Sequence, residues 1–391
     1  MTATHVVTLG SERLIESGAL RGQRIGIVCN PASIDAAFRH IVDRLAAVDG
    51  VTLAAIFGPQ HGFRADVQDN MIESPHTRDL RRRVPVYSLY SETREPTADM
   101  LRGLDALVID LQDVGTRVYT FIYTMANCLR GAARHGVPVV VCDRPNPIGG
   151  EAVEGPVLDE ACASFVGQFP IPLRHGMTIG ELARLFNEHF GLGARLEVVA
   201  MGGWRRPMYH DATGLPWVMP SPNLPTLDSA IVYPGMVLVE GTNLSEGRGT
   251  TRPFELCGAP WIDGEALAAG LNAAQLPGVH FRPVVFEPTF QKHALEACGG
   301  CQMHVTDRGR FRPVEAGVAV IDAVRRAAPE RFAWRDPPYE YETVKMPIDM
   351  LYGSDQLRRQ LEDGRPAAEI AAGWTARVDA FRETRERFLL Y

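Results

Sequence analysis

The stretch ALVIDLQDVGTRVYTFIYTMANCLRGAARHGVPVVVCD, residues 106–143, decides the fold of this protein. It holds two nearly continuous apolar runs, 106–112 and 137–143, and a helical pattern over 119–135 between them. Strands that are apolar on both faces are typical of a parallel sheet that helices cover on each side. The stretch therefore predicts a β–α–β unit with two parallel strands.

The same alternation of strands and helices extends over the first half of the chain. Further strands are expected at 24–30, 52–58 and 84–90, and further helices at 36–48 and 178–190. Thr178 and Glu181 have the spacing of a capping box at the start of the last of these helices. We expect an α/β fold in which residues 1–225 form a Rossmann-like, doubly wound and mostly parallel sheet with its helices.

The second half has a different pattern. Residues 203–262 are rich in Pro, Gly and Trp and show little periodicity, which predicts long loops. Further elements are expected as a helix at 264–272, strands at 279–287 and 301–307, and helices at 313–327 and 366–388. Residues 226–391 are therefore predicted to form a second, smaller α+β domain, and a length of 391 residues agrees with two domains.

Composition excludes several functional classes. The net charge is −7 and no block of basic residues occurs, so a nucleic-acid partner is not expected. No apolar stretch approaches the roughly 20 residues that a membrane span needs. The first ten residues lack the pattern of a secretion signal, and the seven cysteines are scattered and partly in apolar runs. These features predict a cytoplasmic protein with buried free thiols, and they leave its oligomeric state open.

Polar loops follow each predicted strand of the first domain, and their residues are held by Pro and Gly. They are Asn30-Pro31, 58–62, 90–92, 112–115 and 143–147. The carboxyl ends of parallel strands meet at one edge of a sheet, where ligands of such folds bind. The sequence therefore predicts a pocket there, lined by arginines and carboxylates and suited to a small polyhydroxylated ligand such as a sugar.

The densest polar run is EGTNLSEGRGTTRPFE, residues 240–255. It holds three glutamates, two arginines and three glycines. Arginine and glutamate offer paired donors and acceptors, and glycine allows a ligand to approach the backbone closely. A sugar-binding loop is the favoured interpretation, and a solvated loop with internal ion pairs is the alternative.

Other polar residues of the predicted edge have a structural and a functional interpretation. Asp113 and Arg117 fit a local ion pair at a helix start as well as a ligand contact. The two prolines around Asn146 favour a site for the loop that carries Asp143 and Arg144. His61, placed after a strand in a Pro/Gly-rich loop, favours a functional role over a structural one.

Several motifs of other chemistries are missing. The turn after the first strand, 29–33, is not a G-x-G-x-x-G, and no Walker A sequence or G-x-S-x-G occurs. No H-E-x-x-H spacing exists, so a metal would need ligands from separate loops. Cys298 and Cys301 form a lone C-x-x-C, for which packing is the favoured interpretation. No cofactor or metal is expected.

Five segments resemble a family of bacterial exo-β-N-acetylmuramidases, which are glycoside hydrolases of peptidoglycan recycling. They are FGPQHGFR (57–64), IDLQDVGTRVYTFIYTM (109–125), CDRPNPIGG (142–150), SPNLPT (221–226) and EGTNLSEGRGTTRPFE (240–255). The resemblance implies removal of a terminal β-linked N-acetylmuramic acid, or a related amino sugar, from peptidoglycan-derived fragments, with the site between two domains. The resembling segments follow the same order as in the family, and the resemblance extends from about residue 22 to the last residues of the chain.

One position departs from the family. The resemblance implies a catalytic glutamate in a Gly-Pro-Glu-His-Gly loop, and this chain has Gln60 there. An amide can neither donate a carboxylic proton nor serve as a base. Three interpretations remain open. In the first, another carboxylate supplies the acid, and Gln60 orients a substrate acetamide. In the second, the chain binds amino sugars without turnover. In the third, the chain belongs to a branch that acts on another glycoside.

The expected site residues come from these loops and from the resemblance. The candidate catalytic residues are Gln60, His61, Glu73, Glu92 and Glu246. The candidate substrate-binding residues are Asn30, Arg64, Asp113, Arg117, Tyr119, Tyr123, Asp143, Arg144, Asn146, Asn223, Glu240, Asn243, Arg248, Thr250 and Arg252. Glu240 is also a candidate for the missing acid.

Overall fold

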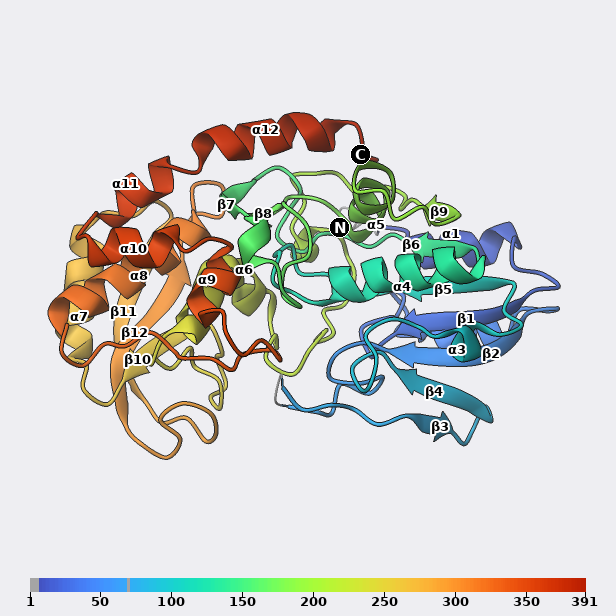
Figure 1. Cartoon of the computed structure of the whole chain (residues 1–391), viewed down its shortest axis with the longest axis horizontal. Coiled ribbons are helices and arrows are strands. Elements are labelled where there is room, and N and C mark those ends of the chain that lie inside the picture. The colour runs from blue at the N-terminus through green and yellow to red at the C-terminus, as the bar shows by residue number, and fades with distance from the viewer. Residues whose placement is uncertain (1–6, 69–70) are drawn as a thin grey trace, which may run out of the picture.

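A computed structural model describes residues 7–68 and 71–391 of the chain. Its larger sheet has seven strands in the order β3-β4-β2-β1-β5-β6-β9 (Figure 1). All neighbours pair in parallel except β3, which lies antiparallel to β4 at one edge. Without β3, the strand order in sequence numbers is 3-2-1-4-5-6, which is a doubly wound order. The predicted α/β fold with a mostly parallel sheet is confirmed.

The apolar runs predict five strands of this sheet, β1, β2, β4, β5 and β6, usually with slightly later ends than the structure shows, whereas β3 and β9 are not expected from them. The bounds of this sheet's strands are β1 Arg24–Cys29, β2 Thr52–Gly58, β3 Thr77–Asp79, β4 Val84–Ser88, β5 Ala106–Asp110, β6 Val139–Cys142 and β9 Leu196–Val199. A two-stranded sheet of β7 Glu154–Val157 and β8 Pro172–Arg174 follows β6 in the chain. The helices of this part are α1 Gly10–Ser17, α2 Ile41–Ala46, α3 Ala98–Leu101, α4 Phe121–His135 and α5 Ile179–Arg184.

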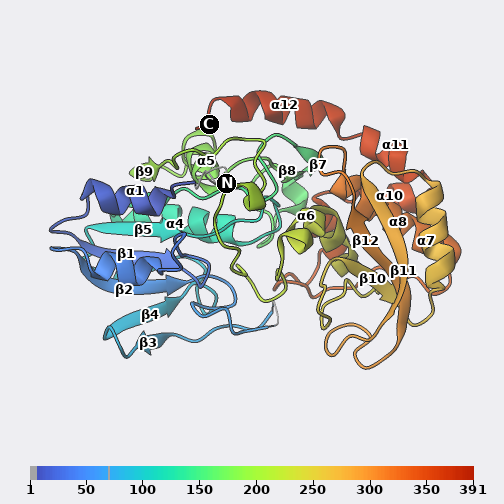
Figure 2. The same cartoon turned by 180° about the vertical axis from the view of Figure 1, so that it is seen from behind.

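Helices cover both faces of the larger sheet, which explains why its central strands are apolar throughout. In β5, Leu107 and Ile109 pack into the core that contains α4, whereas Val108 packs with α1 and α2 on the other side. Figure 1 shows α4 in front of the sheet, and the opposite view in Figure 2 shows α1 there. Successive side chains of a strand point to opposite faces, so both sets must be apolar.

The second part is built around a three-stranded antiparallel sheet in the order β10-β12-β11. Its strands are β10 Leu256–Ala259, β11 Val279–Phe286 and β12 Cys298–Val305. Its helices are α6 Leu227–Met236, α7 Gly264–Ala273, α8 Pro313–Ala327, α9 Pro347–Tyr352, α10 Gln356–Glu362, α11 Ala367–Ala372 and α12 Thr375–Glu386. Cys298 and Cys301 both lie in β12, and each is buried and free of a disulfide.

Three sequence-based expectations need correction. Residues 203–262 contain helix α6, which sequence periodicity does not reveal because Ser229 to Met236 are all buried and Pro234 interrupts the pattern. The helix expected at 366–388 is two helices, because the chain bends at Gly373. The helix expected at 178–190 changes after Arg184 into a π-helical turn, although its capping box of Thr178 and Glu181 is confirmed.

The C-terminal helix α12 runs back across the molecule. It leads from α11, above the smaller sheet, to a chain end beside α5 in both views (Figures 1 and 2). Tyr391 there donates a hydrogen bond from its hydroxyl to Asp143 Oδ2 at 2.8 Å. Within the described ranges, no helix combines the length and apolar character needed to cross a membrane.

Candidate active site

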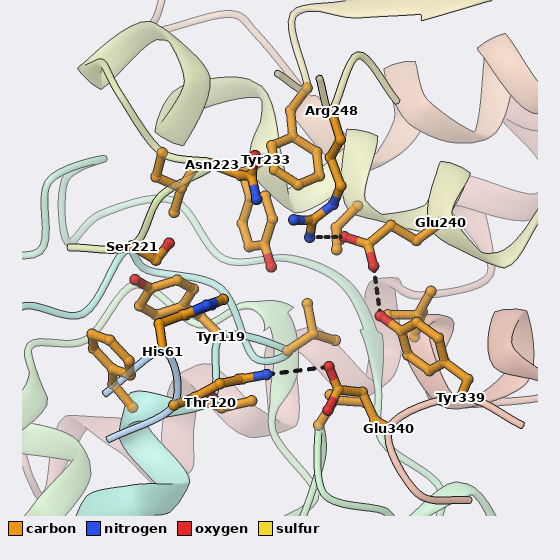
Figure 3. Close-up of a pocket in the computed structure, with 18 residues that line it drawn as sticks. His61, Tyr119, Thr120, Ser221, Asn223, Tyr233, Glu240, Arg248, Tyr339 and Glu340 are labelled. Carbon is orange, nitrogen blue, oxygen red and sulfur yellow. Dashed lines mark hydrogen bonds and ion pairs between the residues drawn. The ribbon is translucent and has the colours of Figure 1, made fainter. Parts of the chain in front are cut away.

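A polar pocket lies where the loops at the carboxyl end of the larger sheet meet the second part of the molecule (Figure 3). The polar and aromatic residues that line it are Gln60, His61, Tyr119, Thr120, Phe121, Ser221, Asn223, Tyr233, Glu240, Arg248, Phe254, Tyr339 and Glu340. They come from six separate segments of the chain. The pocket is therefore a product of the tertiary structure rather than of one motif.

Glu240 and Arg248 form a buried ion pair in the wall of the pocket. Glu240 lies in the 3-10 helix Val237–Gly241, which continues α6. Its Oε1 lies 2.7 Å from Arg248 Nη2, and its Oε2 accepts a 2.7 Å hydrogen bond from the Tyr339 hydroxyl (Figure 3). Both oxygens are thus engaged by fixed donors.

A second carboxylate extends this network away from the pocket. Glu246 lies 3.2 Å from Arg248 Nε and 2.9 Å from Lys292 Nζ. Burial alone would lower the pKa of Arg248, but the charges of Glu240 and Glu246 outweigh burial and raise it. Burial would likewise raise the pKa of Glu246, and Lys292 and Arg248 lower it instead. The mutual attraction of Arg248 and Glu246 therefore favours their charged forms although both are buried.

Glu340 is the other carboxyl group of the pocket, and its surroundings differ. It accepts hydrogen bonds from the Tyr90 hydroxyl at 2.8 Å and from Gln60 Nε2 at 3.3 Å. Burial, together with the charge of Glu240, raises the pKa of Glu340 to about 7. A carboxyl group whose pKa is raised by burial is a common feature of sites for acid–base catalysis.

The backbone is in an uncommon conformation on both sides of the pocket. His61 has a φ of 68° and Glu340 has a φ of 45°, both in the left-handed region that non-glycine residues rarely adopt. The ring of His61 is oriented by a 2.8 Å hydrogen bond between Nδ1 and the carbonyl of Val67. Such strain is typical of functional sites, where surrounding contacts hold a side chain in place.

Neutral donors complete the lining. Burial raises the pKa of Tyr119 and that of Tyr233, so both phenols keep their protons. Figure 3 shows Ser221, His61 and Tyr119 across the pocket from Glu240 and Glu340. Phenols, hydroxyls and amides beside aromatic rings suit a sugar, which carries both hydroxyls and an apolar ring face.

Six of the residues expected from the sequence come together in this pocket. They are Gln60, His61, Tyr119, Asn223, Glu240 and Arg248. Asn223 accepts a 3.0 Å hydrogen bond from Gln68 Nε2, which connects the loop before α6 to the loop after β2. The expectation that polar loops at the sheet edge contribute to one pocket therefore agrees with these positions.

The structure places other expected binding residues inside the fold, with protein partners. Asp143 accepts hydrogen bonds from Thr178, Gly180 and Tyr391, and burial raises its pKa to about 7. Arg144 is paired with the fully buried Asp110 at 2.5 Å. Asn30 donates to the carbonyl of Pro220, Asn146 donates to that of Met177, and Asp113 accepts from the amide of Gly115. These contacts join loops to one another.

Arg117 and Tyr123 also lie outside the pocket. Arg117 is fully buried, and its guanidinium donates to the backbone carbonyls of Pro156, Ile171, Leu351 and Tyr352. Tyr123 is fully buried in α4 within the main core. Neither side chain lines the pocket. Arg117 points toward neighbouring loops and Tyr123 toward the core, whereas Tyr119 between them faces the pocket.

The remaining candidates lie at the surface or inside the 240–255 loop. Glu73 and Glu92 are exposed and lie near Arg94 and His76, and Arg64 lines a separate hollow beside β4. Asn243 bonds the backbone of Arg331 and Ala333, Thr250 donates to the carbonyl of Gly247, and Arg252 pairs with Glu255. The contacts of Thr250 and Arg252 lie within the loop, whereas those of Asn243 join it to the segment after α8.

Sequence reasoning missed Glu340 and Tyr339, and it included Tyr90 only as the first residue of the predicted loop 90–92. The run Tyr339-Glu340-Tyr341-Glu342, which follows two prolines, is the signal that could have revealed Glu340, because acidic residues among aromatic ones are unusual in a solvated loop. In residues 7–68 and 71–391, no three His, Cys, Asp or Glu side chains lie close enough together to hold a metal ion.

The two carboxyl groups in this polar pocket, Glu240 and Glu340, fit the pair of acidic residues that most glycoside hydrolases use. Comparison with known proteins agrees. The N-terminal and C-terminal family models of exo-β-N-acetylmuramidase NamZ match residues 25–228 and 231–391. The chain therefore belongs to the exo-β-N-acetylmuramidase NamZ family.

Individual relatives extend this similarity over nearly the whole chain. Peptidoglycan β-N-acetylmuramidase NamZ of Bacillus subtilis (strain 168) is 46% identical over 372 residues, which cover 95% of this chain and 88% of that protein. Two crystal structures of DUF1343 family proteins from Bacteroides fragilis NCTC 9343 have TM-scores of 0.89 (BF0371, 35% identity) and 0.76 (BF0379, 29% identity). Each comparison covers 98% of this chain and 99% of the other.

Proposed function

We propose that this protein is a glycoside hydrolase that releases a terminal β-linked N-acetylmuramic acid from peptidoglycan-derived fragments. The observation that carries the proposal is the pocket itself, in which Glu240 and Glu340 face neutral sugar-binding donors. The 46% identity to a peptidoglycan β-N-acetylmuramidase over 95% of the chain supports the same substrate class. Binding without turnover is not favoured, because carboxyl groups remain in the pocket although position 60 is an amide.

We further propose that the protein acts in peptidoglycan recycling inside the cell. All seven cysteines are buried and none forms a disulfide, as is usual in a reducing compartment. We also infer that the chain divides near residue 226 into a Rossmann-like domain and a smaller domain that contributes the 240–255 loop. The doubly wound strand order and the junction between the family models at 228–231 support this division.

The experiment is a substrate panel with the purified protein. We expect hydrolysis of a disaccharide in which N-acetylmuramic acid is β-linked to N-acetylglucosamine, and of an aryl β-N-acetylmuraminide. The corresponding β-N-acetylglucosaminide, which lacks the lactyl group, is expected to react at least about tenfold more slowly, because one lost charged contact is worth roughly 1.5–3 kcal/mol. No turnover of any member above buffer would refute the hydrolase, and calorimetry with the free sugar would then reveal a binding protein.

A further inference from the structure

Glu340 is held in the pocket by its local backbone. Tyr339 and Glu342, on either side of it, form an antiparallel bridge, and Glu340 and Tyr341 between them have positive φ values of 45° and 67°. This tight turn directs Tyr339 to Glu240 and the carboxyl of Glu340 toward Gln60 and Tyr90. Only 4% of Glu340 is exposed, so its carboxyl is shielded from bulk water.

The orientation of the Gln60 amide follows from its partners. Gln60 Oε1 accepts a 2.6 Å hydrogen bond from the Thr120 hydroxyl, and Nε2 lies 3.1 Å from the Tyr90 hydroxyl and 3.3 Å from Glu340 Oε1. The amide nitrogen therefore faces Glu340 and can only donate to it. A glutamate at position 60 would instead place a second carboxyl against Glu340.

The other carboxyl groups near the pocket are poorly suited to donate a proton. Glu240 is held in an ion pair with Arg248, and Glu246 is held between Arg248 and Lys292. A general acid must have a proton to donate, but Lys292 and Arg248 lower the pKa of Glu246. Both oxygens of Glu240 are already engaged by Arg248 and Tyr339. Burial, by contrast, raises the pKa of Glu340 to about 7.

We propose that Glu340 is the catalytic proton donor of this site and that Gln60 is the positioning residue that aligns its carboxyl. This inference rests on the proposed hydrolase function and supplies the acid that position 60 lacks. Glu340 transfers its proton to the glycosidic oxygen as the bond from that oxygen to C1 breaks, and the electron pair stays with the departing alcohol. Water adds its hydroxyl to C1, and its remaining proton restores the Glu340 carboxyl.

The test compares two leaving groups in Glu340→Gln. A sugar leaving group needs a proton to depart, whereas 2,4-dinitrophenolate departs as a stable anion. We expect kcat on the disaccharide to fall by about 10²–10⁴-fold, and kcat on the 2,4-dinitrophenyl β-N-acetylmuraminide by less than about tenfold. Retained dinitrophenyl activity also shows that the variant is folded. Equal losses on both substrates, or no loss on either, would overturn the assignment.

The pH profile gives an independent measurement. Because the protonated carboxyl is the active form, kcat/KM of the wild type on the disaccharide should fall as pH rises through about 7, the pKa of Glu340. In Glu340→Gln, this fall of kcat/KM at high pH, the basic limb of the profile, should be absent. The control is Glu342→Gln, at a residue that does not line the pocket and whose Oε1 accepts hydrogen bonds from the backbone amides of Val344 and Lys345. It should keep the wild-type profile; a basic limb that persists in Glu340→Gln would overturn the proposal.

Gln60→Glu tests the positioning role separately. Like charges at this distance oppose ionisation, so the pKa of Glu340 should rise and the basic limb should move to higher pH. The opposite result would be a gain in disaccharide turnover of about 10²-fold or more, together with a basic limb of the pH profile that no longer depends on Glu340. That result would make residue 60, and not Glu340, the general acid of this site. If the wild type hydrolyses no substrate of the panel, the proposed function fails before the question of Glu340 arises.

Discussion

At the scale of single residues, some buried charged side chains of this protein line the pocket, and others, such as Arg117, hold the fold together. Arg117 is fully buried, and burial lowers its pKa to about 10. Its guanidinium nonetheless donates to four backbone carbonyls that belong to the β7–β8 region and to the end of α9. Arginine can satisfy several carbonyls at once because its donors are fixed in one plane. Arg117 therefore connects segments more than two hundred residues apart in the sequence.

We expect Arg117→Met to lower the free energy of unfolding by about 2–4 kcal/mol, because four buried carbonyls would lose their donor. The variant no longer has to bury a charge, and the desolvation cost that it avoids offsets part of that loss. Urea denaturation measures the change. The control is Arg365→Met, whose exposed ion pair with Glu369 is worth only about 0.3–0.5 kcal/mol. A change within 0.5 kcal/mol of the wild type, about the effect of a surface substitution, would contradict the structural role of Arg117.

At the scale of elements, α6 and α8 pack with their backbones in contact. A Cβ atom on Gly235 would lie 1.7 Å from the carbonyl oxygen of Pro313, and one on Gly317 would lie 2.3 Å from the carbonyl oxygen of Gly235. Such close approach is possible only between glycines. It positions the helix that continues into Glu240, so packing in the second part of the molecule determines where a pocket carboxylate lies.

Gly235→Ala should therefore destabilise the protein by about 3 kcal/mol or more, because the helices must separate. Gly270→Ala is a matched substitution in α7, where an added Cβ meets no atom within 4 Å. It should raise the free energy of unfolding by roughly 0.5–1 kcal/mol, since alanine loses less backbone entropy. Thermal unfolding of both variants compares them, and equal melting temperatures would argue against the close packing.

At the scale of the whole molecule, α12 returns from the second part to the loops of the first (Figure 1). Its Arg385 is buried and donates to the carbonyls of Gly150, Glu151, His175 and Gly176. Burial lowers the pKa of Arg385 to about 10, so it remains charged at neutral pH. The helix thus holds the chain end against loops that follow β6 and β8.

We expect Arg385→Met to reduce the free energy of unfolding by about 2–4 kcal/mol and to lower the urea midpoint. Arg382→Met, on the half-exposed side of the same helix, should cost less than about 1 kcal/mol. Tryptophan fluorescence and far-ultraviolet circular dichroism follow the transition. If the two variants unfold at the same midpoint, α12 does not stabilise the molecule through Arg385.

The sequence by itself determined the layers of the first part and half of the pocket. Apolar runs placed β1, β2, β4, β5 and β6 within a few residues, because a strand buried on both faces must be apolar throughout. The loops after such strands must share one edge, and this geometry led to Gln60, His61 and Tyr119. The run 240–255 likewise led to Glu240 and Arg248 from its composition alone.

Only the tertiary structure decided which polar residues face the pocket and which hold the fold. Arg117, Asp143 and Arg144 have the same side-chain chemistry as pocket residues, and long-range partners turn them inward. The carboxyl that faces Gln60 comes from residue 340, 280 positions along the chain, so no local pattern could connect the two. The protonation of Glu340 is likewise set by burial and by partners from distant segments, and these exist only in the folded chain.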